Sequence, residues 1–304
     1  MLLDVKNLDI SYGSKLTVSG VNIQLDKGEI LSIVGESGSG KTTVIRAVMG
    51  CLPGRGHVSG GSITFDGRDM LKNTREDWRK ISGREMSMIF QDSGNMINPI
   101  RRIGEQFTDY ILAHAPQKSK AEAAEMAKDM LNKVRLPNPQ NIMNSYPFEL
   151  SGGMRQRVGI ARALIMNPKL IIADECISAL DVSIQAQVVN LMKDIQQETG
   201  TAYLFIAHDL SMVKYISDRI GVLHLGHLLE TGTTEEIFEN PIHPYTRSLL
   251  SAIPLPNPVV EKRRVAETYD YATSGIDYNK GTDHHVSGSH YVKCTDEEFA
   301  KWCK

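Results

Sequence analysis

The sequence of 304 residues has only four cysteines, no long apolar run and almost no excess of either charge. Cys51, Cys176, Cys294 and Cys303 are too scattered for a disulfide framework, which fits a reducing compartment. No stretch approaches the roughly 18 consecutive apolar residues that cross a bilayer. The first six residues also lack the basic-then-apolar order of a signal peptide. These absences argue against a secreted or membrane-spanning protein.

Neither charge dominates, because 34 lysines and arginines face 36 aspartates and glutamates, a formal net charge of −2. This balance gives the chain no overall attraction to nucleic acid or to acidic lipid, although it does not exclude a local patch of charge. Hydrophobic residues make up 41% of the chain, enough to bury a core and to exclude a disordered or fibrous protein. The length fits one large or two modest domains.

Strand-like segments come first along the chain. Alternation of Val21, Ile23 and Leu25 predicts one strand. The short aliphatic run Glu29–Val34 predicts another, buried on both faces. A glycine-rich loop and a helix over about Lys41–Met49 follow this second strand.

The middle of the chain, about residues 92–168, predicts a helical insertion. Residues 121–134 carry an apolar stripe at helical spacing, formed by Ala124, Ala127, Met130, Leu131 and Val134. Ser151 opens a second helix that runs to about Asn167, where Pro168 gives a stop signal.

Strands and helices alternate again beyond Pro168. Strands are predicted at 170–173 and 202–207, a helix at 183–198, and further strands at 220–225 and 228–231. The alternation predicts an α/β fold with a mostly parallel sheet covered on both faces. From Pro254 onward, recurring prolines and few aliphatic residues predict a loosely structured tail over 254–304.

The strongest chemical signal is Gly35-Glu36-Ser37-Gly38-Ser39-Gly40-Lys41-Thr42, which matches G-x-x-x-x-G-K-[ST] between a predicted strand and a predicted helix. The glycines let successive backbone N–H groups point at phosphate oxygens, and the helix adds its positive dipole end. Lys41 is placed to reach the β- and γ-phosphates, and the Thr42 hydroxyl to bind Mg²⁺. The segment therefore predicts a P-loop.

Two acids follow the apolar run 170–173. Asp174 would hold Mg²⁺ through water, and Glu175 is placed to polarise an attacking water molecule. Taken alone, acids at the end of a strand also mark an ordinary solvated loop. Beside a P-loop they favour a hydrolytic site.

Ser151-Gly152-Gly153 is a second glycine-rich helix start. Its serine can cap the helix, and its glycines let an anion approach free N–H groups, so it could bind a nucleotide held by another copy. Gln91 and His208 each follow a predicted buried strand, at the ligand edge of an α/β sheet. A lone glutamine or histidine in such a place is also commonly structural.

In this order the motifs resemble those of an ABC-type ATPase over about residues 12–208. They are the P-loop, Gln91, Leu150–Gly153, Asp174-Glu175, Ser178-Ala179-Leu180-Asp181 and His208. The resemblance implies a P-loop NTPase core with an N-terminal β-subdomain and a helical subdomain insertion. It also implies ATP and Mg²⁺ as cofactors.

The resemblance implies roles for the matching residues. Tyr12 would stack on adenine, Gln91 would sense the γ-phosphate, and His208 would contact that phosphate. Asp181 would cross the interface of a head-to-tail dimer that holds two ATP molecules. The implied catalytic group is Lys41, Gln91, Glu175 and His208, and the implied metal ligands are Thr42, Gln91 and Asp174. The implied nucleotide-binding set is Tyr12, Gly35, Glu36, Ser37, Gly38, Ser39, Gly40, Lys41, Thr42, Thr43, Ser151, Gly152, Gly153 and Asp181.

The segment 240–254, with His243-Pro244-Tyr245, is similar to one in ATPases of oligopeptide, dipeptide and nickel importers. It can also be a plain turn into a short amphipathic helix. The resemblance divides the chain into an ATPase domain, 1–253, and an importer-type tail, 254–304. Met154 departs from the glutamine of many ABC proteins, and Cys176-Ile177 departs from the usual Pro-Thr.

The resemblance places the chain at the cytoplasmic face of a cell membrane, where it would power an importer. Its partners would be permease subunits, a second ATPase subunit and, indirectly, an extracytoplasmic solute-binding protein, with no nucleic acid. The helical insertion and Gln91 are the expected docking region, and the loop 92–103 is the specific segment expected to make the contact. The sequence identifies neither the transported solute nor whether the second ATPase subunit is the same chain.

Other functions stay open beside this one. A soluble ABC-type switch acting on nucleic acid or ribosomes usually needs a second cassette or a long coiled coil, and the sequence has one cassette and no sustained heptads. Glu175 and His208 argue against a cassette that binds ATP without splitting it. The tail histidines and Cys294 fit no standard zinc spacing, and two tail cysteines are too few for a four-thiolate iron–sulfur site.

Overall fold

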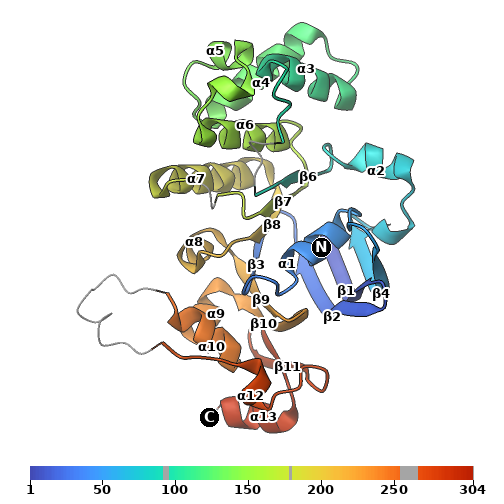
Figure 1. Cartoon of the computed structure of the whole chain (residues 1–304), viewed down its shortest axis with the longest axis vertical. Helices are drawn as coiled ribbons and strands as arrows, with labels where there is room; N and C mark the ends of the chain where they lie inside the picture. The colour runs from blue at the N-terminus through green and yellow to red at the C-terminus, as the bar shows by residue number, and fades with distance from the viewer. Residues whose placement is uncertain (92–95, 178–179, 254–265, 304) are drawn as a thin grey trace, which may run out of the picture. The chain divides into compact units, whose positions relative to one another are not determined.

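The computed structural model describes residues 1–91, 96–177, 180–253 and 266–303 (Figure 1). They form two compact units. The unit that we call the helical unit comprises Met1–Leu2, Leu25–Glu29 and Leu71–Phe205. The unit that we call the P-loop unit comprises Leu3–Gln24, Ile30–Met70 and Ile206–Lys304. The domain boundaries given by the resemblance, 1–253, 254–304 and an insertion at about 92–168, stay predictions.

The P-loop unit contains a four-stranded sheet in the order β2-β1-β4-β5. Its strands are β1 (Leu3–Tyr12), β2 (Lys15–Leu25), β4 (Gly56–Phe65) and β5 (Arg68–Asp69). β1 and β4 are antiparallel, with Leu3 opposite Phe65. Val21, Ile23 and Leu25 are buried at alternate positions of β2, as predicted, so one face of this strand packs into the core.

Five other strands of the P-loop unit lie in the order β3-β9-β10-β12-β11. They are β3 (Ile30–Val34), β9 (Arg219–His224), β10 (His227–Thr233), β11 (Thr282–Ser287) and β12 (His290–Cys294). β3 is parallel to β9, whereas the other neighbouring pairs are antiparallel. Every residue of β3 is buried, which confirms the strand predicted before the glycine-rich loop.

Short helices complete the P-loop unit. They are α1 (Lys41–Val48), α8 (Leu210–Ile216), α9 (Thr234–Glu239), α10 (Pro244–Ser251), α12 (Tyr271–Ser274) and α13 (Asp296–Trp302), with the 3-10 turn η1 (Met70–Lys72) at the unit boundary. Thr233 and Thr295 begin α9 and α13 as capping boxes with Glu236 and Glu298. The helix predicted at Lys41–Met49 is confirmed by α1.

The helical unit contains the parallel strands β6 (Met86–Ile89) and β7 (Leu170–Asp174), with β8 (Ala202–Ile206) on the other side of β7. All residues of β7 and β8 are buried, as strands covered on both faces require. Its helices are α2 (Arg75–Ile81), α3 (Ile103–His114), α4 (Lys120–Lys133), α5 (Pro139–Asn144), α6 (Gly152–Leu164) and α7 (Val182–Thr199), with the 3-10 turn η2 (Pro147–Glu149). Across the described residues, none of the helices is both long enough and apolar enough to cross a membrane.

The predicted apolar stripe of α4 is off by one residue at its start. Ala123 is fully buried, whereas Ala124 is only half-buried. Ala127, Met130, Leu131 and Val134 are buried as predicted. A stripe that begins at Ala123 continues at steps of four, three, one and three residues, which is the regular spacing of one helix face. Ser119 begins α4 and accepts a hydrogen bond from the Glu122 amide at 3.2 Å.

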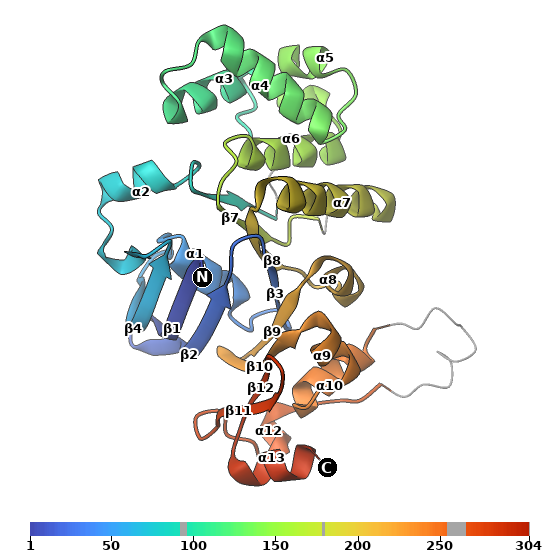
Figure 2. The same ribbon diagram turned by 180° about the vertical axis from the view of Figure 1, so that it is seen from behind.

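The prediction of a loosely structured tail is wrong for residues 266–303. Figure 2 shows β11 and β12 beside β10, and β12 pairs with β10 at Glu230 and Thr231. Val292 and Cys294 are buried against Ile242, so the hairpin has an apolar face of its own. The few apolar residues of the tail are therefore enough to hold the hairpin, because the hairpin extends an existing sheet. The rest of the predicted tail, residues 254–265 and 304, lies outside the described residues.

Candidate nucleotide-binding site

The glycine-rich segment forms a tight loop between β3 and α1 in the P-loop unit. Gly35 has φ 149° and Gly40 has φ 107°, a region that side chains other than glycine rarely enter. A Cβ at Gly35 would lie 2.0 Å from the Leu223 carbonyl oxygen, so only glycine fits there. Gly40, the N-cap residue of α1, has no side chain that could cap the helix. The loop thus presents backbone N–H groups at a helix N-terminus, the arrangement that binds phosphate.

Lys41 lies across this loop with only 4% of its surface exposed. Its Nζ donates to the carbonyl oxygens of Gly35 and Glu36, each at 2.8 Å, and to Ser39 Oγ at 3.5 Å. These acceptors compensate for burying the ammonium group. The structure therefore places a positive charge at the centre of the predicted phosphate cradle. Thr42 and Thr43 follow in the first turn of α1 with half-buried side chains.

The β9–β10 turn supports the loop from one side. The Gly226 N–H donates to the Ser39 carbonyl oxygen at 2.8 Å, and Ser39 is itself 2% exposed. Glu36, Ser37 and Gly38, by contrast, are exposed. The loop is thus held at its base while its tip is open.

Tyr12 and His208 also belong to the P-loop unit. Tyr12 ends β1, and its ring lies so close to Gly56 that a Cβ there would be 2.8 Å from Tyr12 Cε1. His208 is exposed between β8 and α8. Asp209 then caps α8 by accepting from the amides of Ser211 and Met212. The predicted roles of Tyr12 in adenine stacking and of His208 at the γ-phosphate stay predictions.

Asp174 and Glu175 lie at the carboxyl end of β7 in the helical unit, as the sequence predicted. Asp174 is 8% exposed. Glu175 has φ 48°, a conformation that a glutamate adopts at a cost of about 1 kcal/mol or more. The chain therefore turns sharply as it leaves the buried strand. Cys176 behind it is fully buried, and burial raises the pKa of its thiol to about 12.

Gln91, which is exposed, follows β6 in the same unit. Its backbone oxygen accepts from the Gln156 side-chain amide at 3.5 Å, and that amide also donates to the Cys176 carbonyl oxygen. Gln156 thus joins the segment after β6 to the segment after β7. Sequence analysis missed this residue; the available signal was a glutamine on the buried face of α6, four residues before Ile160.

The second glycine-rich segment begins α6, where Ser151 Oγ accepts from the Met154 amide at 3.3 Å. Ser151 and Gly152 are exposed, and Gly153 is half-buried. Asp181 begins α7 in the same manner, with its carboxylate accepting from Ser183 Oγ at 2.8 Å and from the Ile184 amide at 3.0 Å. The hydrogen bond from Ser183 is the main cause that lowers the Asp181 pKa.

The predicted site residues fall into two groups. The P-loop unit holds the P-loop with Thr43, together with Tyr12 and His208. The helical unit holds Gln91, Ser151–Gly153, Asp174, Glu175 and Asp181. Ser178 and Ala179, which belong to the predicted motif before Asp181, lie outside the described residues.

Two family descriptions match the chain. "ABC transporter" matches residues 18–178, and "Oligopeptide/dipeptide transporter, C-terminal region" matches residues 229–275. The chain belongs to the ABC transporter family. The first match includes both glycine-rich segments, Gln91 and the Asp174-Glu175 pair, so it confirms the resemblance seen in the motifs.

Curated relatives match this ABC cassette over nearly its whole length. The dipeptide transport ATP-binding protein DppF of Lactococcus lactis subsp. cremoris is 44% identical over 302 residues, 98% of this chain and 95% of the relative. The oligopeptide transport ATP-binding protein OppF of Bacillus subtilis is 45% identical over 305 residues, 98% of this chain and 97% of the relative. The C-terminal region thus belongs with the cassette in proteins of this group.

Solved structures agree with the fold. The dimeric post-hydrolysis state of the ATP-binding cassette MJ0796, bound to ADP and Pi, matches with a TM-score of 0.69 and 26% identity, over 77% of this chain and 99% of that chain. The predicted P-loop ABC ATPase fold is therefore confirmed. The chain is an ABC ATPase and binds ATP.

Proposed function

We propose that this chain hydrolyses ATP to power an importer for oligopeptides, dipeptides or a similar small solute. The observation that carries the proposal is the segment 229–275, which matches the C-terminal region of oligopeptide/dipeptide transporters and is joined to an ABC cassette in one chain. Transport relatives at 43–45% identity favour this function over a switch acting on nucleic acid or ribosomes.

In the proposed reaction, water attacks the γ-phosphate of ATP in line with the bond to the leaving ADP. Lys41 stabilises the charge that develops on the phosphates, and Glu175 takes the proton from the attacking water. His208 contacts the γ-phosphate from the end of β8. The buried strand β7 supports the role of Glu175, because the residue follows directly after a strand whose backbone is held in the core.

The proposed cofactors are ATP and Mg²⁺. The candidate metal ligands offer a hydroxyl at Thr42, a carboxylate at Asp174 and an amide oxygen at Gln91, and such oxygen donors suit a hard cation. Bound there, Mg²⁺ would neutralise negative charge on the phosphates. The binding and orientation of the nucleotide would otherwise rest on the loop amides and Lys41.

A second ATPase subunit is proposed to complete each nucleotide site. Ser151–Gly153 presents a helix N-terminus with two exposed residues, and such a terminus attracts anions. In a head-to-tail dimer this loop would face the nucleotide on the other subunit's P-loop, and Asp181 would lie at the interface. The related cassette MJ0796 is described as dimeric, which supports such an assembly.

Docking to permease subunits is proposed at the segment 92–103 and Gln91. Residues 92–95 lie outside the described residues, but Met96 is 55% exposed and Ile100 is 82% exposed. The helical unit has a cavity of about 180 Å³, and the residues that line it include Phe90, Tyr110 and Arg162. Phe90 directly precedes Gln91 in the sequence. Exposed apolar residues and a cavity in the same unit suit the docking of a partner's helix. The chain would then work at the cytoplasmic face of the membrane, with a solute-binding protein on the other side.

The test is ATP turnover by the purified full-length chain. Lys41→Ala is expected to abolish turnover, and Glu175→Gln to reduce it by more than about 100-fold while ATP stays bound, since one catalytic proton transfer is lost. Lys27→Ala and Glu239→Gln change exposed residues outside the site and are the matched controls. Normal turnover in both site variants would contradict the assignment. Purification from membranes with permease subunits, and stimulation of turnover by a peptide, would test the transport role.

A further inference from the structure

We propose that Tyr245 is a positioning residue for nucleotide binding, because its hydroxyl holds the P-loop backbone at Glu36. The inference rests on the proposed ATP site and adds a residue from the C-terminal region to it. The Glu36 N–H donates to Tyr245 Oη at 2.9 Å. These residues are 209 positions apart, and both belong to the P-loop unit.

The peptide groups at Glu36 are held on both sides. The N–H of Glu36 is bound by Tyr245, and the carbonyl oxygen of Glu36 accepts from Lys41 Nζ at 2.8 Å. Tyr245 and Lys41 therefore bind the same residue of the loop. Lys41 is also the lysine expected to bind phosphate, so this residue lies next to the predicted phosphate site. The Glu36 side chain is exposed, and the hydrogen bond to Tyr245 is made by the Glu36 backbone N–H.

The motif His243-Pro244-Tyr245 places the tyrosine. His243 is the N-cap of α10, and its Nδ1 accepts from the Tyr245 amide at 3.0 Å. Burial lowers the pKa of His243 to about 3, so the ring is neutral and can accept at Nδ1. Pro244 occupies the first turn, where its fixed φ suits a helix start. Tyr245 is therefore set at a defined position of the first turn.

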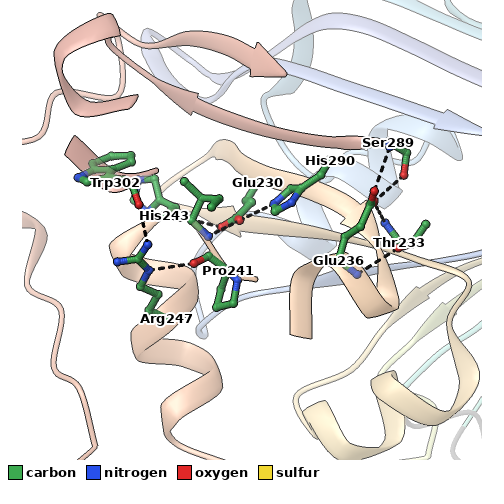
Figure 3. Close-up of polar contacts among 10 residues, drawn as sticks. Glu230, Thr233, Glu236, Pro241, His243, Arg247, Ser289, His290 and Trp302 are labelled. Atoms are coloured by element: carbon green, nitrogen blue, oxygen red, sulfur yellow. Dashed lines mark hydrogen bonds and ion pairs between the residues drawn. The ribbon is translucent and has the colours of Figure 1, made fainter. Parts of the chain in front are cut away.

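A buried carboxylate fixes this helix start in turn. Glu230 accepts from the amides of Ile242 and His243, at 2.7 and 3.0 Å, and from His290 Nε2 at 2.7 Å. Figure 3 shows Glu230 between His243 and His290, so the carboxylate joins α10 to strand β12. The C-terminal hairpin thus supports the helix that carries Tyr245.

The ring of Tyr245 is also held by its neighbours. Tyr245 is 2% exposed and stacks on His224, with ring centroids 4.0 Å apart and planes 21° from parallel. His224 Nδ1 lies 2.7 Å from Tyr278 Oη, which is 3.0 Å from Tyr269 Oη. A ring held on several sides leaves its hydroxyl little freedom to move away from Glu36. The geometry therefore favours a fixed anchor over an incidental contact.

An anchor of this kind lowers the entropy lost when the loop closes around phosphates. Loss of the hydroxyl leaves the Glu36 N–H without its acceptor and lets the loop sample other shapes. Tyr245→Phe in the full-length chain is expected to raise the KM for ATP and the Kd for ADP about 3- to 10-fold, the ratio typical of one hydrogen bond. The kcat should stay within about twofold, because the hydroxyl does not touch the reacting atoms.

Two matched variants separate positioning from general loss of stability. Tyr271→Phe makes the same change in a half-buried tyrosine of the neighbouring α12 and should leave KM and melting temperature unchanged. Thr201→Val removes a buried hydroxyl that donates to the Pro168 carbonyl oxygen at 2.9 Å in the helical unit, so it should lower the melting temperature while KM stays within about twofold. Hydrogen exchange at the Glu36 amide should be faster only in Tyr245→Phe.

The outcomes distinguish this inference from the proposed function. Absence of ATP turnover by the unmodified chain would refute the proposed function. Normal turnover, with KM and ADP affinity unchanged in Tyr245→Phe, would refute the anchor alone. An equal rise in KM for Tyr245→Phe and Thr201→Val would also refute it, since the effect would then follow stability.

Discussion

Glu230 offers the sharpest test of how the C-terminal region is held. Its side chain is fully buried and accepts hydrogen bonds from Ile242, His243 and His290 (Figure 3). The substitution Glu230→Gln keeps the size of the side chain and replaces one carboxylate oxygen by an NH₂ group. Because Oε1 accepts from Ile242 and His290, the new NH₂ group would face the His243 amide, donor against donor.

The loss of stability caused by Glu230→Gln can be worked out from these hydrogen bonds. A hydrogen bond to a charged group contributes about 1.5–3 kcal/mol, and a buried donor left unpaired costs about 1–3 kcal/mol. The substitution loses one such bond and weakens two others, which gives about 3 kcal/mol of lost stability. At about 2–4 °C per kcal/mol for units of 150–250 residues, the melting temperature should fall by about 6–12 °C.

The assay is thermal unfolding of the nucleotide-free chain by calorimetry, with hydrogen exchange at the amides of Ile242 and His243. Both amides should exchange faster in Glu230→Gln. Glu239→Gln, on the exposed end of α9, is the control and should stay within about 1 °C of the unmodified chain. A shift of the same size in both variants, or none in either, would refute the idea that Glu230 holds the start of α10.

Three further predictions concern the helical unit. Leu131→Ala, at a fully buried position of α4, should destabilise this unit by about 2–5 kcal/mol, measured by denaturant unfolding, whereas Ala124→Ser on the half-buried side should change stability by less than about 1 kcal/mol. Cys176 should resist alkylation at pH 8 in the folded chain while exposed Cys303 reacts, as mass spectrometry of the labelled protein would show. Because burial raises the Cys176 pKa from 9.0 to about 12, the thiol contributes stability below pH 9 that is lost as the pH rises toward 12.

The P-loop could be predicted from the sequence because its shape depends on nearby residues. Gly35 and Gly40 adopt backbone angles that glycine favours, and Lys41 binds carbonyl oxygens only five and six positions away. The strand before the loop and the helix after it follow from composition over short windows. The position of Asp174 at the end of β7 is local in the same sense.

Elements that depend on distant partners escaped prediction. β4 contains Gly56, Gly60 and Gly61, a composition that weakens any strand signal, and it forms because it pairs with β1. The hairpin of β11 and β12 likewise exists because β10 offers an edge to β12. The left-handed backbone of Glu175 had no signal in residue type, since glutamate rarely adopts it. In each case the structure depends on partner residues that are distant in sequence, or it requires a backbone conformation that the residue type disfavours.

The motif at 243–245 shows the same limit at a functional position. Sequence reasoning could identify His243-Pro244-Tyr245 as a family marker and as a helix start, and α10 confirms the helix. It could not find the partner of Tyr245, because the contact joins α10 to the loop after β3, 209 positions away in sequence. A substitution at His243 that removes the Nδ1 acceptor should therefore loosen the first turn of α10 and, through Tyr245, the P-loop. If the anchor at Tyr245 holds, a substitution in this marker should therefore weaken ATP binding although it lies outside the ATPase motifs.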